Sequence, residues 1–298
     1  MEGPPVLLGL SLPDVDVWSE RVVVALGQNP GLFTGPGTNT YLVGTGRERL
    51  LLDTGQGLPA YLPVLERALE RAGGARIREI VLTHGHPDHL GGVASVRERF
   101  GPLRVSKRPW PGVDEAAGCE IAPIDDGAVI EVEGATLRAV FAPGHAEDHL
   151  CFVLEEERAL FSGDNVLGVG TTVIPGRGGD LAEYLRSLAR LLAEQPGVIY
   201  PAHGPRIPDG SAKIREYVAH RLEREQQILA ALRDGLSRVG AIVKRIYAAY
   251  PEALHAPAAA SVTAHLRKLE REGRVVCCGE PDALRAEWRL ARVSHQGA

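Results

Sequence analysis

Short runs of apolar and β-branched residues, separated by glycine, asparagine and proline, recur through the first two hundred residues. Such runs are typical of β-strands. We expect strands at 21–26, 40–43, 49–52, 78–82, 103–105, 128–132, 135–141, 149–154, 158–162 and 198–200. Between them, apolar side chains spaced by three and four residues predict helices near 60–72, 90–99 and 180–194. The mixture of strands and helices indicates an α/β fold.

The pattern changes after residue 205. We expect one long helix over 211–233, helices at 239–249 and 260–272, and two short strands near 274–278 and 286–290. Three helices and a small hairpin are the outline of a winged helix, and we interpret the run 256–260 as a loop and a helix start. The chain is therefore divided into a large first domain over 1–208, a connecting helix over 209–235 and a winged-helix-like domain over 236–298.

Composition places the chain among ordinary globular proteins. Its 298 residues are 44% hydrophobic and 24% charged. No apolar stretch approaches the roughly 18 residues of a membrane span, so no membrane association is expected. The first twenty residues carry four acidic side chains and no Lys or Arg, unlike a secretory or mitochondrial presequence. We expect a cytoplasmic protein.

The charge is uneven along the chain. The net charge is −5, yet residues 205–298 hold 16 basic and 11 acidic side chains. A basic C-terminal part of this kind could contact phosphate groups. The four cysteines form no C-x-x-C pair, as expected for thiols in a reducing compartment.

Metal-binding residue types crowd the turn after the strand expected at 78–82. His84, His86, Asp88 and His89 lie within six positions, just before Gly91 and Gly92. Three further groups follow other expected strands, each beside a glycine or proline; they are His145, Asp164 and His203. Loops at one edge of a sheet are where ligands from distant parts of a chain can converge. Seven groups are therefore expected to meet.

Neutral imidazoles and carboxylates are the ligands of a borderline metal such as zinc. The cluster at 84–89 cannot direct all of its groups to one small ion without strain, but it can serve two ions. Seven ligands suit two metals that share one carboxylate and one water. Two metals about 3.5–4 Å apart can activate a bridging water and stabilise entering and leaving oxygens. We therefore expect two zinc ions, while the ligand set also tolerates manganese or iron.

The segment Thr83–His89 resembles the signature of the metallo-β-lactamase superfamily. Four other motifs match in order, at 52–55, 143–145, 163–164 and 202–204. The resemblance implies a four-layer αβ/βα sandwich with the metals at the edge of two facing sheets. It also implies roles for the site residues: His84, His86 and His145 on the first zinc, Asp88, His89 and His203 on the second, Asp164 bridging, and Asp53 orienting the metal loop.

Within the superfamily the chain resembles the lactamase-beta-like protein 2 family. The matching segments are 29–31, 37–46, 161–164, 170–173, 200–205, 220–221, 224–229 and 265–273. This resemblance implies a C-terminal winged helix and metal-dependent cleavage of single-stranded RNA. A mitochondrial site is also implied, although no clear presequence is present. The same pattern resembles fungal thioesterases that release polyketides from carrier proteins.

Three functions remain open. The first, which we favour at this point, is an endoribonuclease that cleaves phosphodiesters of single-stranded RNA, with Asp88 guiding the water or passing a proton to the leaving oxygen. The second is a hydrolase of esters or of acyl thioesters of carrier-protein, coenzyme or glutathione type. The third is a nucleic-acid-binding pseudoenzyme. In each enzyme, four residues are expected to contact substrate: Thr38, Asn39, Thr40 and Asn165.

Overall fold

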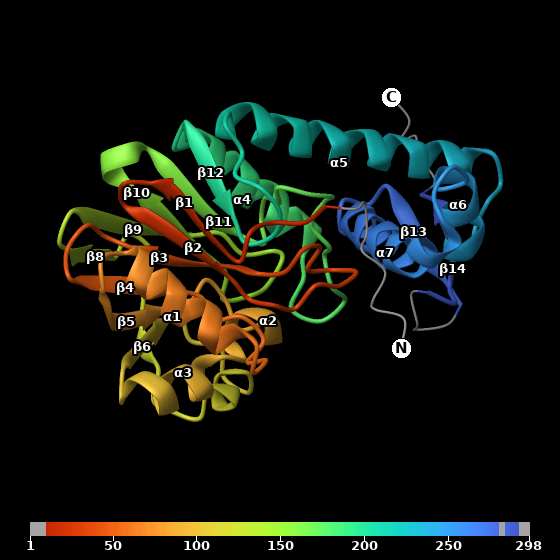
Figure 1. Ribbon diagram of the computed structural model, residues 1–298. Coiled ribbons are helices and arrows are strands. Elements are labelled where there is room, and N and C mark those ends of the chain that lie inside the picture. The colour runs from red at the N-terminus through yellow and green to blue at the C-terminus, as the bar shows by residue number, and fades with distance from the viewer. Residues whose placement is uncertain (1–9, 280–283, 292–298) are drawn as a thin grey trace.

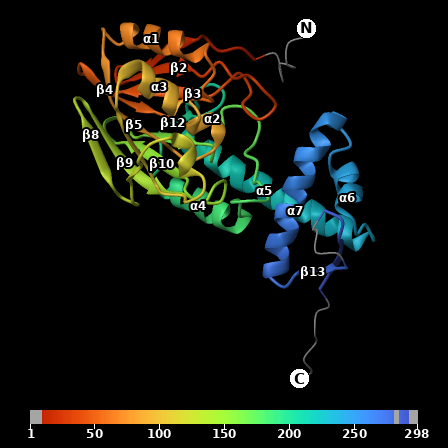
Figure 2. The ribbon, with the colours of Figure 1, turned by 90° about the horizontal axis from the view of Figure 1, so that it is seen from below.

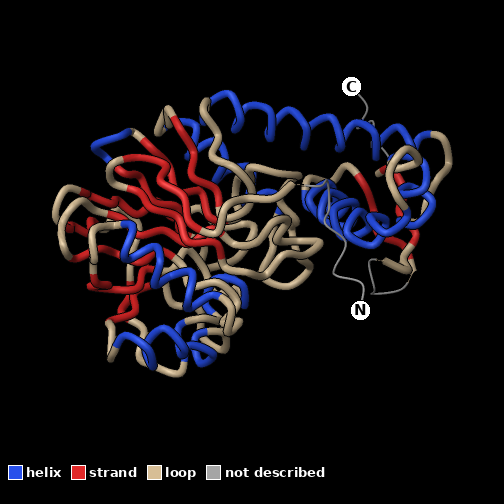
Figure 3. The backbone as a smooth tube through the Cα atoms, viewed as in Figure 1, coloured by secondary structure: helices blue, strands red, loops and turns tan. Residues whose placement is uncertain are grey.

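The computed structural model describes residues 10–279 and 284–291. Its first domain contains two β-sheets packed face to face, with helices on both outer faces (Figures 1 and 3). This is the four-layer αβ/βα sandwich expected from the sequence. Apolar side chains from both sheets meet between them, including Tyr41, Leu52, Phe152 and Phe161.

The larger sheet has seven strands in chain order. They are β1 (Val15–Ser19), β2 (Val22–Leu26), β3 (Asn39–Val43), β4 (Glu48–Leu52), β5 (Arg76–Val81), β6 (Arg104–Lys107) and β7 (Ala122–Pro123). Neighbours are antiparallel from β1 to β4 and parallel from β4 to β7. Every residue of β2 and β3 is buried, because the sheet is covered on both faces.

The smaller sheet has five strands. In spatial order they are β12 (Val198–Pro201), β11 (Ala159–Gly163), β10 (Leu150–Leu154), β9 (Ala135–Phe141) and β8 (Val129–Val132). Only the pair β11–β12 is parallel. The outer face of the larger sheet packs against α1 (Tyr61–Arg71) and α3 (Val93–Phe100), and that of the smaller sheet against α4 (Leu181–Ala193) and α5 (Gly210–Arg233).

The expectation of a single helix at 90–99 was wrong in its bounds, because two helices occupy this region. α2 (Pro87–Leu90) is one turn long, and α3 follows after Gly91 and Gly92. A Cβ at Gly92 would collide with the backbone carbonyl of Thr54, and one at Gly91 would lie 2.9 Å from that of Gln56. The two glycines therefore let the turn that follows 84–89 pack closely against the segment after β4.

The C-terminal residues form a winged helix with a core of its own. Its elements are α6 (Val239–Ile246), α7 (His255–Arg271), β13 (Val275–Cys278) and β14 (Glu287–Leu290). They pack around Trp288 and the last turns of α5, which runs from the sandwich into this domain (Figures 1 and 2). α7 begins five residues earlier than expected. Pro257 does not prevent this start, because it lies in the first turn, where a residue without an N–H is tolerated.

Three short 3₁₀ helices complete the described elements: η2 (Asp114–Ala117), η3 (Glu155–Glu157) and η4 (Glu252–Leu254). The strands β1 and β7 were not expected from the sequence. Across 10–279 and 284–291, no helix has the combination of length and apolar character that a bilayer crossing requires.

Candidate metal centre

The structure brings all seven predicted ligands together at one edge of the sandwich. The segment 84–89 follows β5, and the other three follow β9, β11 and β12. Their ligand atoms form two groups, each within 4.8 Å: His84, His86, His145 and Asp164 in the first, and Asp88, His89, Asp164 and His203 in the second. Asp164 belongs to both groups, as a bridging carboxylate would.

The two carboxylate oxygens of Asp164 face different groups. Oδ2 lies 3.3 Å from His145 Nε2 in the first group. Oδ1 lies 3.1 Å from His203 Nε2 and 3.4 Å from His89 Nε2 in the second. Within the first group, His86 Nδ1 lies 2.9 Å from His145 Nε2. One side chain therefore connects two clusters of imidazole nitrogens.

Hydrogen bonds to the outer imidazole nitrogens aim the inner ones at the centre. His84 Nδ1 lies 3.0 Å from the Thr83 hydroxyl, and His145 Nδ1 donates to the Val173 carbonyl at 2.8 Å. His203 Nδ1 lies 3.3 Å from the Gly37 carbonyl. Such contacts fix the tautomer and leave Nε2 as the metal-facing atom. His86 differs, because it presents Nδ1.

Asp53 organises the loop from behind. Its Oδ1 accepts the Thr83 backbone N–H at 2.8 Å, and its Oδ2 lies 2.8 Å from both the Thr83 hydroxyl and His89 Nδ1. Asp53 itself has φ of 60°, a left-handed conformation that aspartate tolerates better than most residues. Its placement suits the orienting role that the family resemblance implies.

Burial and mutual contacts set the charges of the centre. Burial, with the neighbouring His145, lowers the pKa of His86 to about 4. Burial also opposes the charge of Asp164, but His203 and His89 outweigh it and hold the pKa of this carboxyl well below its usual range. Against burial, Asp164 raises the pKa of His203 to about 9. A divalent cation would therefore meet ionised carboxylates and displace a proton from His203.

Two buried atoms support the fit of a cation. His89 Nε2 and Asp164 Oδ1 are shielded from solvent and, although each lies 3.1–3.4 Å from a neighbouring ligand, neither makes a hydrogen bond of good geometry among the described residues. Buried polar atoms without partners are rare in folded proteins and call for a ligand, ion or water. Five imidazoles and two carboxylates in two groups are a donor set suited to a pair of divalent ions.

His149 is a further residue of the centre whose role the sequence did not reveal. Its Nε2 accepts the backbone N–H of Asp164 at 3.1 Å. Gly163 permits this approach, because a Cβ there would lie 2.6 Å from the same nitrogen. The only sequence signal was its position at a strand start near His145. His149 thus holds the backbone of the bridging carboxylate.

The structure places Thr38, Asn39, Thr40 and Asn165, which were expected to contact substrate, outside the pocket. All four residues are buried, and none lines the pocket. Asn39 Nδ2 donates to the carbonyls of Pro201 and Gly204, at 2.9 and 2.8 Å. Asn165 Nδ2 donates to the Ala142 carbonyl at 2.7 Å. These side chains point into the protein and hold its strands and the loops that carry the metal-binding groups together.

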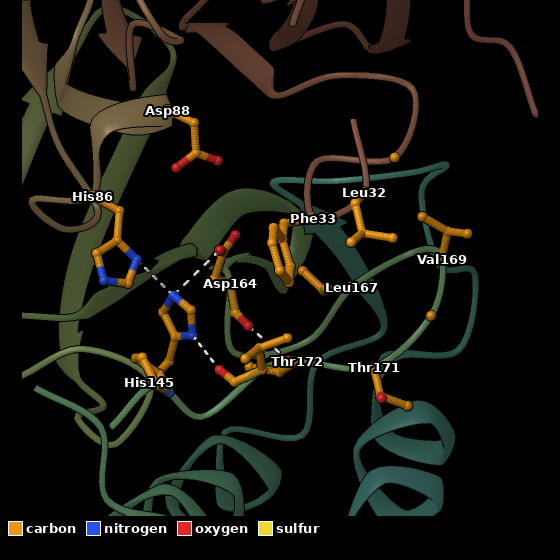
Figure 4. Close-up of a pocket in the computed structure, with 14 residues that line it drawn as sticks. Leu32, Phe33, His86, Asp88, His145, Asp164, Leu167, Val169, Thr171 and Thr172 are labelled. Carbon is orange, nitrogen blue, oxygen red and sulfur yellow. Dashed lines mark hydrogen bonds and ion pairs between the residues drawn. The ribbon is translucent and has the colours of Figure 1, made fainter. Parts of the chain in front are cut away.

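A pocket of about 290 Å³ opens beside the metal-binding groups (Figure 4). One wall carries ligand side chains of the centre: His86, Asp88, His145 and Asp164. The facing wall is largely apolar, with Leu32, Phe33, Leu167 and Val169. Phe33 is 61% exposed, and none of the described lining residues is Lys or Arg. The pocket therefore combines metal-binding groups with an apolar surface.

Comparison with known proteins agrees with this geometry. The family described as "Metallo-beta-lactamase superfamily" matches residues 33–203. The family described as "Beta-lactamase associated winged helix domain" matches residues 239–288. The chain is 41% identical over 290 residues to "Lactamase-like protein adaB" of Aspergillus niger, covering 92% of this chain and 88% of that protein.

Two thioesterases are also similar. "Atrochrysone carboxyl ACP thioesterase AgnL7" of Paecilomyces divaricatus is 47% identical over 222 residues, or 74% of this chain and 67% of that protein. "Atrochrysone carboxyl ACP thioesterase" of Aspergillus chevalieri is 43% identical over 252 residues, which cover 81% of this chain and 78% of that protein.

Solved structures share the whole architecture. A beta-lactamase domain protein from Burkholderia ambifaria superposes with a TM-score of 0.80 at 20% identity, over 96% of this chain and 97% of that one. A metallo-beta-lactamase family protein from Thermus thermophilus superposes with a TM-score of 0.72 at 26% identity, over 94% of this chain and 99% of that one. The chain therefore belongs to the metallo-beta-lactamase superfamily, as a hydrolase with the associated C-terminal winged helix domain.

Proposed function

We propose that this chain is a di-zinc thioesterase that hydrolyses acyl thioesters with an apolar acyl group, carried on an acyl carrier protein or a similar thiol. The observation that carries the proposal is the apolar wall that faces the metal-binding groups across one pocket. An apolar wall provides a surface for an acyl chain or ring next to the reacting carbonyl. The names of the two thioesterase relatives support the same substrate class.

The pocket favours this reading over RNA cleavage. Proteins that bind nucleic acids depend on Lys and Arg contacts to phosphate. The described lining residues include neither, so the pocket wall offers no such contact to a phosphodiester chain. Its apolar side chains instead suit an uncharged acyl group. The thioesterase, which was the second of the sequence-based functions, therefore replaces the endoribonuclease as our proposal.

The metal-binding residues are proposed to hold zinc in the two groups already described. When bound, two such ions supply Lewis-acid polarisation of a carbonyl and lower the pKa of water. Five imidazoles with two carboxylates are typical zinc ligands. The outer hydrogen bonds of Asp53, Thr83 and Val173 keep the imidazoles in the tautomers that this role requires.

Asp88 is the proposed catalytic residue among the protein groups. Its carboxylate faces the pocket, and its Oδ2 lies 3.3 Å from His203 Nε2 and 3.4 Å from His89 Nε2. Burial opposes its charge, but the two histidines outweigh this effect and hold the pKa of Asp88 well below its usual range. Ionised at neutral pH, Asp88 can accept a hydrogen bond from the attacking water and orient it toward the carbonyl.

The acyl group would then lie against the apolar wall, which includes Leu32, Phe33 and Val169. These residues belong to two loops, 27–38 and 164–179. Both loops are held from behind, since the Tyr217 hydroxyl donates to the Gly170 carbonyl at 3.1 Å and Asn29 Oδ1 accepts the Thr38 N–H at 2.9 Å. The wall is therefore preformed, which limits the entropy lost on binding.

A parallel assay tests the proposal. Zinc-loaded protein is given a benzoyl thioester of N-acetylcysteamine and a single-stranded RNA, each with and without a chelator. We expect thioester hydrolysis that the chelator abolishes, with the RNA intact. His86→Ala should lose both activity and bound zinc, while His255→Ala, in the winged helix, serves as the matched control. Metal-dependent RNA cleavage with an inert thioester would overturn the proposal.

A further inference from the structure

Two segments that the sequence singled out are not used by the metal centre. The first lies on α5 and consists of 220–221 and 224–229. The second, 265–273, comprises the C-terminal part of α7 and the two residues after it. The structure brings them together where α5 and α7 cross (Figures 1 and 2). Glu225 there pairs with Lys268 at 2.6 Å through one oxygen and with Arg274 through the other. The carboxylate of this junction is thus already fully paired.

Two arginines of the junction are buried without a counter-ion. Arg221 is 3% exposed and Arg224 is 7% exposed. No carboxylate of the described residues forms an ion pair with either guanidinium. Arg221 donates to the Thr172 carbonyl and lies over the Tyr184 ring at 5.2 Å. A carbonyl and a ring face offset only part of the cost of burying a full charge.

Arg224 has the weaker set of contacts of the two. Its Nη1 donates to Gln227 at 2.7 Å, and its guanidinium lies 4.2 Å from the centre of the Tyr247 ring. Its Nε is buried and has no hydrogen-bond partner among the described residues. The guanidinium therefore keeps an unused donor inside the protein, which folded proteins usually avoid.

His265 completes the unsatisfied set. It is 1% exposed, and neither of its ring nitrogens has a partner in the part of the chain that the structure describes. Burial and the positive charges of Arg221, Lys268 and Arg224 hold the pKa of His265 well below its usual range. A neutral imidazole keeps one N–H donor. The junction thus combines the positive charge of two buried guanidinium groups with donors on Arg224 and His265 that have no partner among the described residues.

We propose that this junction, formed by Arg221, Arg224 and His265, binds an oxyanion of the phosphate class. Guanidinium groups match phosphate oxygens in geometry and charge, and buried charges are normally paired. The site is separate from the metal centre, and it stands whether or not the proposed thioesterase function is correct. Its ligand is either free phosphate or the phosphate of an ester such as phosphopantetheine.

The junction also touches the pocket. Arg221 binds the carbonyl of Thr172, a residue that lines the pocket and whose hydroxyl donates to the Asp164 carbonyl at 2.7 Å. An anion that neutralises Arg221 would therefore act one residue away from the pocket wall.

Titration calorimetry on the metal-loaded full chain tests the proposal, with inorganic phosphate at constant ionic strength. We expect phosphate binding by the wild type that weakens at least roughly tenfold in Arg224→Met and in His265→Leu, since each removes a donor to a charged group. Arg215→Met, an exposed position on the same helix, is the matched control and should bind as the wild type. Circular dichroism checks folding, and Arg224→Lys replaces any variant that does not fold.

The outcomes are distinct. Phosphate bound at the metal centre would give the same isotherm in all variants, and that result, or no binding by the wild type, overturns the proposal. Comparison of pantetheine with 4′-phosphopantetheine identifies the source of the anion. If 4′-phosphopantetheine binds more tightly than inorganic phosphate and this binding depends on Arg224, the site is assigned to a phosphate ester. If 4′-phosphopantetheine and inorganic phosphate bind with equal affinity, the site is assigned to the free ion.

Discussion

Asp53→Asn tests how the metal loop is held. In the structure, Asp53 Oδ2 lies 2.8 Å from His89 Nδ1 and keeps the proton on that nitrogen. With that proton held on Nδ1, Nε2, which faces Asp88 and Asp164, is the nitrogen available to a metal. In the variant, an amide NH₂ in the same place must donate to Nδ1, which moves the proton to Nε2. The opposite amide orientation would set the NH₂ against the Thr83 backbone N–H, which Oδ1 accepts at 2.8 Å.

The size of the effect follows from the bond that is lost. A hydrogen bond to a charged group contributes about 1.5–3 kcal/mol, and about 1.36 kcal/mol is a tenfold change in an equilibrium constant. Loss of an outer contact to a metal-binding histidine typically weakens metal affinity by about 10–100-fold. We therefore expect the group with His89 to bind zinc about 10–100-fold more weakly, and the group with His145 to change less.

Chelator competition on the purified protein measures both zinc affinities, and elemental analysis gives the stoichiometry. Asp126→Asn is the matched control, because Asp126 is paired with Arg190 on the surface, away from the centre. If both zinc affinities of Asp53→Asn equal those of the wild type in a folded protein, the assigned orienting role of Asp53 is wrong.

Three further predictions follow from the contacts described. Asp164→Ala should lose both zinc ions together in elemental analysis, because its two oxygens face separate groups; loss of one alone would indicate a terminal ligand. Phe33→Ala should raise KM for a benzoyl thioester about tenfold with kcat nearly unchanged, since the ring contributes on the order of 1.4 kcal/mol of apolar contact, whereas an acetyl thioester and the control Val129→Ala should show no change. Asp180 caps α4 by accepting the N–H groups of Ala182 and Glu183, and its hydrogen bond with Arg271 lowers its pKa. A carboxyl group with a lowered pKa stabilises the fold at pH values above the pKa of the unfolded state, near 4, and this contribution is lost as the pH falls. Asp180→Ala should therefore lower the free energy of unfolding by about 1 kcal/mol at pH 7 and by much less near pH 3. A difference in denaturant titrations that does not depend on pH would contradict this.

The central strands were predictable because both faces of the sheets are covered. β2, β3, β10 and β11 are buried along their whole length, and their runs of apolar residues reflect this. β1 escaped prediction because it is an edge strand interrupted by the exposed Asp16, and only neighbouring strands determine its pairing. The break between α2 and α3 depends on close packing against Thr54, which local spacing does not reveal.

The ligand set was easier to predict than the pocket. His84 to His89 are close in sequence, and every other ligand lies within four residues after the end of a strand, so local patterns indicated where they would meet. The apolar wall is built from two loops distant in sequence, and nothing near Phe33 or Val169 predicts that these loops meet. Thr38 and Asn39 were expected in the pocket, but strand pairing with the His203 loop turns them inward.

The central claim is that two metal ions lie between these seven side chains. Diffraction from crystals of the zinc-loaded protein, recorded at the zinc absorption edge, measures this directly. We predict two anomalous peaks roughly 3.5–4 Å apart, one in each group, with Asp164 between them. A single peak, or peaks that lie away from His145 and His203, would contradict the claim.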